Sequence, residues 1–189
     1  MKRICSLFFV LILISNGPFY GQFGINYSHK SLYKELSKST KLDSIKLLEI
    51  VNADSVFCNG KFFEILDRSN TCQIGYIYIG RVNTCRSGGC SVQAKSNVSG
   101  QSEYFDYYIF FEKDLSVSLV KVFNYQASHG QEVTSSGWLR QFKGYNHQKN
   151  LNIGKDIDAI SGATISVYSI TADIEHITQL VTTLGKMKK

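Results

Sequence analysis

A short stretch near the C-terminus, residues 156–166, combines the residue types that can hold a phosphate group. It reads Asp-Ile-Asp-Ala-Ile-Ser-Gly-Ala-Thr-Ile-Ser, so hydroxyls, small residues and acids stand close together. Gly162 and Ala163 allow a ligand to approach the backbone. The hydroxyls of Thr164 and Ser166 can donate a hydrogen bond to a phosphate or be esterified by it. The chemistry that this stretch suggests is therefore the binding, or the covalent attachment, of a phosphate.

Apolar residues follow this stretch at alternating steps of three and four, which predicts an amphipathic helix. They are Val167, Ile170, Ile174, Ile177, Val181 and Leu184. We expect the helix to end at Gly185, because Gly is common just past a helix end, and the lysines after it suit the C-terminal carbonyls. Residues 161–166 then lie at the helix N-terminus, whose unpaired N–H groups and dipole favour an anion. The structural alternative is a capped helix start without a ligand.

The pattern Asp158-x-x-Ser161-Gly162-Ala163-Thr164 resembles the flavinylation motif of the FMN-binding domain family, to which the NqrC and RnfG subunits of bacterial respiratory complexes belong. In that family a flavin transferase joins FMN by a phosphoester bond to the threonine that closes the motif. The resemblance implies that Thr164 is the acceptor. The residues that it implies for recognition and for seating the cofactor phosphate are Asp158, Ser161, Gly162, Ala163, Thr164 and Ser166.

A second part of the chain resembles the same family. There a Gly-containing loop, often Glu-Thr-Pro-Gly-Leu-Gly, precedes a segment with Trp and Gln-Phe-x-Gly, matched here by Trp138, Gln141-Phe142 and Gly144. This chain departs from the family at the loop, where residues 129–132, His-Gly-Gln-Glu, replace the Pro-Gly pair. The resemblance covers roughly residues 73–184. It implies an α+β fold in which helices flank an antiparallel sheet.

The segments before the loop predict a scaffold. Residues 29–51 have the apolar spacing of two helical pieces, one on each side of residues 39–40. Residues 61–66 and 73–82 are rich in aromatic and β-branched side chains, which predicts strands. Residues 104–111 and 115–125 predict an antiparallel hairpin, with Val117, Leu119 and Phe123 on one face. We expect the tyrosines of its first strand to lie in the core, although they could stack on a ring cofactor. A short helix is expected to start at Ser135–Ser136.

The N-terminus has the three parts of a signal peptide: a basic start, the apolar run 7–14, and small or helix-breaking residues up to position 22. We expect a signal peptide at 1–21, a helical segment at 22–55 and an FMN-binding domain at 56–189. An uncleaved N-terminal anchor is the alternative. Either way, the domain is expected to be exported, to the periplasm or the outer face of a membrane.

The four cysteines after this segment are Cys58, Cys72, Cys85 and Cys90. An even number in an exported chain suggests two disulfides, and sequence proximity favours Cys58 with Cys72 and Cys85 with Cys90, although three pairings are possible. A redox-active Cys85/Cys90 pair is a further alternative. The spacing of the Cys and His residues does not favour a metal site. The formal net charge of +6 is spread along the chain and does not indicate nucleic-acid binding.

Together with the expected signal peptide, the resemblance implies an extracytoplasmic electron-transfer flavoprotein with FMN on Thr164. Its partners would be a flavin transferase during maturation and redox proteins in the membrane or periplasm. His129 could donate a proton to a reduced flavin, although a histidine in a polar loop is commonly just exposed. Two other classes of function remain: a flavin-dependent reductase of a small extracytoplasmic substrate, and a disulfide-stapled binding or structural domain without flavin.

Overall fold

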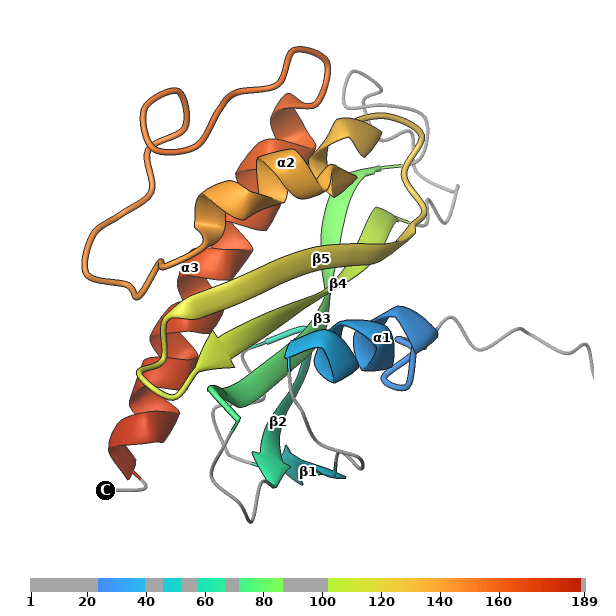
Figure 1. Cartoon of the computed structure of the whole chain (residues 1–189). Coiled ribbons are helices and arrows are strands. Elements are labelled where there is room, and N and C mark those ends of the chain that lie inside the picture. The colour runs from blue at the N-terminus through green and yellow to red at the C-terminus, as the bar shows by residue number, and fades with distance from the viewer. Residues whose placement is uncertain (1–23, 40–45, 52–57, 67–71, 87–101, 188–189) are drawn as a thin grey trace, which may run out of the picture.

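The computed structural model describes residues 24–39, 46–51, 58–66, 72–86 and 102–187, and these form an α+β fold (Figure 1). The antiparallel sheet has the order β1-β2-β3-β4-β5, so strands that follow one another in the chain are neighbours in the sheet. The strands are β1 (Lys46–Ile50), β2 (Gly60–Leu66), β3 (Ile74–Arg86), β4 (Ser102–Glu112) and β5 (Val117–Tyr125). The expected antiparallel sheet flanked by helices is confirmed.

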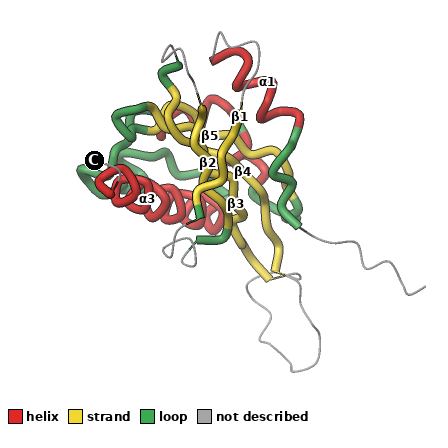
Figure 2. Tube along the Cα trace, turned by 90° about the horizontal axis from the view of Figure 1, so that it is seen from below, coloured by secondary structure: helices red, strands yellow, loops and turns green. Residues whose placement is uncertain are grey.

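The helices cover both faces of this sheet, as Figure 2 shows for α1 and α3. They are α1 (Lys30–Ser39), the 3-10 turn η2 (Gln131–Thr134), α2 (Ser136–Leu139), the 3-10 turn η3 (Arg140–Phe142) and α3 (Thr164–Met187). The expected short helix is α2, which begins directly after its N-cap residue Ser135. Together α2 and its two flanking turns lie beside β5.

Residues 105–111 of β4 are buried throughout, because helices pack on both faces of the sheet. Tyr107 and Ile109 belong to the core under α3, whereas Tyr108 and Phe110 belong to the core under α1. This alternation follows from the period of two in a strand. The expected core position of the tyrosines is confirmed for Tyr107 and Tyr108, each 0% exposed.

Helix α3 buries the whole predicted apolar face against the sheet. The predicted end of the helix was wrong, because α3 continues through Gly185 to Met187. Gly185 has a packing role: a Cβ there would lie 2.6 Å from Cδ1 of Leu115, in the turn between β4 and β5. The absence of a side chain thus lets the helix lie close to that turn.

Two predictions for the scaffold were wrong. The second helical piece of residues 29–51 is instead the strand β1, where Leu47 pairs with Ile65 of β2. An isolated short helix is only marginally stable, and pairing with β2 satisfies the same backbone groups. Val117 does not share a face with Leu119, since a register shift opposite Phe110 and Phe111 inserts an extra residue in β5.

The expected Cys58–Cys72 disulfide is not formed, and both side chains are thiols. Cys58 packs beside the core under α3, whereas Cys72 lies in the core under α1, so the sheet separates them. The side chain of Cys85 and the whole of Cys90 lie outside the described residues, as does the expected signal peptide at 1–21. Within the described part of the chain, no helix has the length and apolar character needed to span a membrane.

Candidate functional site

Residues 161–166 lie at the N-terminus of α3, as predicted. The carbonyl of Ile160 accepts a hydrogen bond from the N–H of Ala163 at 3.1 Å, which closes a turn around Ser161 and Gly162. Gly162 has φ of 81°, a left-handed conformation that residues with a Cβ rarely adopt. The carbonyl of Ala163 then accepts from the N–H of Val167 at 2.9 Å, so Ala163 caps the helix and Thr164 is its first residue.

The side chains of this stretch divide into an outer and an inner group. Ser161, Gly162 and Thr164 are exposed, whereas Ala163 and Ser166 are 2% and 4% exposed. No described residue accepts a hydrogen bond from the backbone N–H groups of residues 164–166. The Thr164 hydroxyl therefore stands in solvent beside three unused donors and the positive end of the helix dipole.

Two side chains from α2 and η3 hold the backbone of Asp158. The indole Nε1 of Trp138 donates to the Asp158 carbonyl at 2.9 Å, and the Asp158 N–H donates to Oε1 of Gln141 at 2.8 Å. The ring of Phe142 meets Trp138 edge-on, with centroids 5.4 Å apart, and limits the movement of the indole. The structure thus brings together the two segments that carry the resemblance. Trp138 and Gln141 were identified from the sequence through the resemblance, but no sequence pattern predicts their hydrogen bonds to Asp158.

The loop before η2 packs directly on the first turn of α3. Gly130 has φ of 86°, and a Cβ on it would lie 2.6 Å from Oγ of Ser166. Oη of Tyr125 donates to the carbonyl of His129 at 2.5 Å and lies 3.4 Å from the same Ser166 oxygen. The Ser166 hydroxyl is therefore a packing contact. Tyr125, which lies beside it, was not identified as a site residue from the sequence. The side chain of His129 itself is exposed.

Asp156, the first acid of the stretch, faces its own loop instead of the helix start. Its carboxylate accepts hydrogen bonds from Nζ of Lys149 at 2.6 Å and from the backbone and side-chain nitrogens of Asn152, each at 3.1 Å. The hydrogen bond from Lys149 is the main reason that the pKa of this carboxyl lies well below its usual value. Asp156 thus shapes the loop that leads to Asp158, whose exposed carboxylate remains available for recognition.

A shallow hollow of about 310 Å³ begins one helical turn beyond Thr164. Thr164, Tyr168, Thr171 and Glu175 follow one another at steps of four, three and four, so they share one face of α3. The last three line the hollow, whose other lining residues are Leu151, Asn152, Ile153 and Ala172.

Three contacts describe the chemistry of this hollow. Thr171 is 2% exposed, and its Oγ1 has no hydrogen-bond partner among the described residues. Oε1 of Glu175 accepts from the N–H of Leu151 at 2.6 Å, which fixes the opposite wall. Tyr168 is 58% exposed and Ile165 is 41% exposed, so two large side chains close to Thr164 on the helix are open to solvent. The hollow therefore offers an aromatic ring and an unused buried hydroxyl to a ligand.

Within the described residues, no three His, Cys, Asp or Glu side chains gather as metal ligands would. The geometry suits a phosphoester at Thr164 with a ring system near Tyr168. No protein-family model matches this chain, and no curated protein is significantly similar to it.

Proposed function

We propose that this protein is an extracytoplasmic electron carrier with FMN joined by a phosphoester bond to Thr164. The observation that carries the proposal is the exposed Thr164 hydroxyl on the first residue of α3, beside backbone donors that no described residue uses. When bound, FMN accepts and releases one or two electrons, and the protein sets its position and its electrostatics.

The residues of the helix start fit the phosphate of such a cofactor. The N–H groups of residues 164–166 can donate to its oxygens, and the helix dipole offsets part of its negative charge. Gly162 holds the turn that keeps this end of the helix open. In forming the ester, the Thr164 oxygen bonds to the FMN phosphorus as the bond from phosphorus to the donor's leaving group breaks, and that leaving group departs with the hydroxyl proton. The chain thereby gains FMN less one water. Asp158 and Ser161 are exposed where a flavin transferase would have to recognise the motif.

The hollow beside Tyr168 fits the ring end of the same cofactor. Tyr168 lies four residues after Thr164, about 6 Å further along the axis at the rise of an α-helix. Its ring can stack on an isoalloxazine, and Oγ1 of Thr171 can hydrogen-bond to a polar ring atom. The open side of the hollow leaves such a ring accessible to redox partners, which favours a carrier. A small substrate in the hollow would instead favour the reductase alternative.

Coexpression with a flavin transferase tests this proposal. The intact mass should increase by FMN less one water, the protein should stay yellow after acid denaturation, and peptide mapping should place the addition on Thr164. Thr164→Val should abolish the addition. Thr183→Val is the matched control, because Thr183 is an exposed threonine on the same helix. If the wild type stays colourless beside an active transferase, the helix start is only capped and the binding-domain alternative is favoured.

A further inference from the structure

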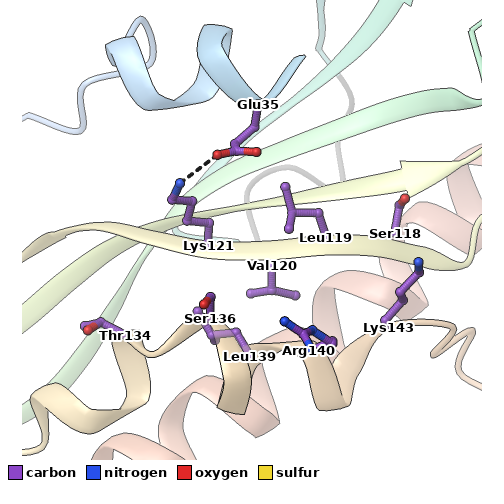
Figure 3. A pocket seen from close by; sticks show the side chains of 10 residues that line it. All are labelled: Glu35, Ser118, Leu119, Val120, Lys121, Thr134, Ser136, Leu139, Arg140 and Lys143. Carbon is purple, nitrogen blue, oxygen red and sulfur yellow. Dashed lines mark hydrogen bonds and ion pairs between the residues drawn. The ribbon is translucent and has the colours of Figure 1, made fainter. Parts of the chain in front are cut away.

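A second cavity, of about 320 Å³, lies along the outer edge of β5 (Figure 3). Four consecutive residues of the strand, 118–121, line it. Neighbouring side chains of a strand point to opposite faces of the sheet, so a cavity on one face would meet only every second residue. The remaining lining residues also come from both faces of the sheet: Glu35 belongs to α1 on one face, and Leu139 belongs to the core on the other face. The cavity therefore follows the edge of the strand.

This edge is unpaired in the described part of the chain. Strand β5 pairs only with β4, and the one backbone link on its outer side is at Val117, which bonds to Gly144 and Tyr145 at 2.7 and 2.8 Å. From Leu119 to Val122 the pairing with β4 runs without a register shift, so the edge is regular there. A regular, unpaired edge offers a row of N–H and C=O groups to an added strand.

The charges around the cavity favour an acidic partner. Nζ of Lys121 forms an ion pair with Oε1 of Glu35 at 2.9 Å, and Lys38 shares this oxygen at 3.1 Å. On the opposite wall Arg140 and Lys143 project toward β5, and neither forms an ion pair with any described residue (Figure 3). The hydroxyls of Ser118, Thr134 and Ser136 add hydrogen-bonding groups, while Val120 and Leu139 supply a buried apolar floor.

We propose that the outer edge of β5, from Ser118 to Lys121, is the docking site for an extended acidic segment of a partner protein. The segment would add to the sheet as a further strand, with an acidic side chain between Arg140 and Lys143 and an apolar one toward Leu139. Backbone hydrogen bonds would supply affinity, and the two cations would select the charge of the segment. The site does not involve Thr164, so it is independent of the flavin proposal.

The probe is a short fluorescein-labelled peptide of the repeat Glu-Thr-Val-Thr, compared with the same peptide carrying Lys in place of Glu. Side chains two residues apart lie on the same face of a strand, so this repeat presents both Glu and Val to the wall that holds Leu139, Arg140 and Lys143. By fluorescence anisotropy, only the Glu peptide should bind. The double variant Arg140→Glu/Lys143→Glu should weaken it by at least about tenfold, since two favourable charge contacts become repulsive. The control Lys155→Glu/Lys186→Glu makes the same change in net charge at exposed sites elsewhere and should bind normally. Thr164→Val should also bind normally.

Amide exchange followed by NMR tests the geometry of binding. The Glu peptide should slow the exchange of outward-facing amides within residues 118–121 of full-length protein. The proposal is wrong if the charge-reversed variant binds as well as its control, or if protection appears elsewhere. The proposal is also wrong if free citrate, at matched ionic strength, displaces the peptide but does not itself slow the exchange of those amides. The cavity would then be a site for small anions.

Discussion

The Tyr107 hydroxyl donates a hydrogen bond to Oδ2 of Asp173 at 2.5 Å, between β4 and α3. Burial raises the pKa of Asp173 above its usual value, although the hydrogen bond from Tyr107 and the nearby His176 oppose this. Burial also raises the pKa of Tyr107 well above its usual value, so this hydroxyl keeps its proton. The carboxyl is thus the group of the pair that titrates in the ordinary range of pH.

We expect the free energy of unfolding to fall as pH rises through the raised pKa of Asp173. Within that window, which begins near the unfolded value of about 4, the folded state binds more protons than the unfolded state, so a rise in pH favours unfolding. Asp173→Asn keeps the shape and should remove this part of the pH dependence in urea unfolding. Glu132→Gln, at an exposed position, is the control and should keep it. An unchanged pH profile in Asp173→Asn would contradict the prediction.

Trp138→Phe should slow flavinylation while the protein remains folded. The substitution removes the hydrogen bond from Nε1 to the Asp158 carbonyl, which holds the motif in place, and should cost about 1 kcal/mol of stability. The measurement is the yield of the FMN adduct against time by intact mass. Phe142→Leu disturbs the same aromatic contact but leaves the hydrogen bond, so it should flavinylate faster than Trp138→Phe. Equal rates would show that the hydrogen bond has no positioning role.

The long helix and the hairpin could be predicted from the sequence, because their signals are local and repeat over many residues. Strand β1 could not, since its five residues become a strand by pairing with β2. The position of Thr164 at a helix start followed from the small residues before a periodic segment. The residues that hold this helix start in place could not be predicted, because Trp138 lies 20 residues before Asp158 and Tyr125 lies 41 residues before Ser166. Only the fold brings these pairs together.

Gly130→Ala and Gly162→Ala should differ in their cost, although both glycines have left-handed backbones. Each substitution strains the backbone by about 1 kcal/mol. At Gly162 the new methyl group enters open space, whereas at Gly130 it meets Oγ of Ser166 at 2.6 Å. We expect Gly130→Ala to lower the free energy of unfolding by about 1–3 kcal/mol more, as overpacking does. In urea unfolding, Ser166→Gly should recover part of this loss in the Gly130→Ala background and none in Gly162→Ala.

Asp106→Asn should be among the most destabilising single changes in the sheet. The Asp106 carboxylate is 1% exposed and accepts from Nε and Nη2 of Arg81 at 2.6 and 3.0 Å. Nδ2 of Asn124 donates to it as well, at 2.7 Å. Removing the negative charge breaks an ion pair whose side chains are only 14% and 1% exposed, and losing one member of such a buried pair typically costs about 3–5 kcal/mol.

Chemical denaturation of Asp106→Asn, compared with Glu49→Gln, measures this cost. Glu49 forms an ion pair with Lys61 at 2.9 Å, but both side chains are 41% exposed, so its loss should cost well under about 1 kcal/mol. Arg81 also lies over the ring of Tyr104, with Cζ 3.7 Å from the centroid, and this contact does not require Asp106. If Asp106→Asn costs no more than Glu49→Gln, the other contacts of Arg81 suffice to hold the guanidinium, and the carboxylate does not organise the centre of the sheet.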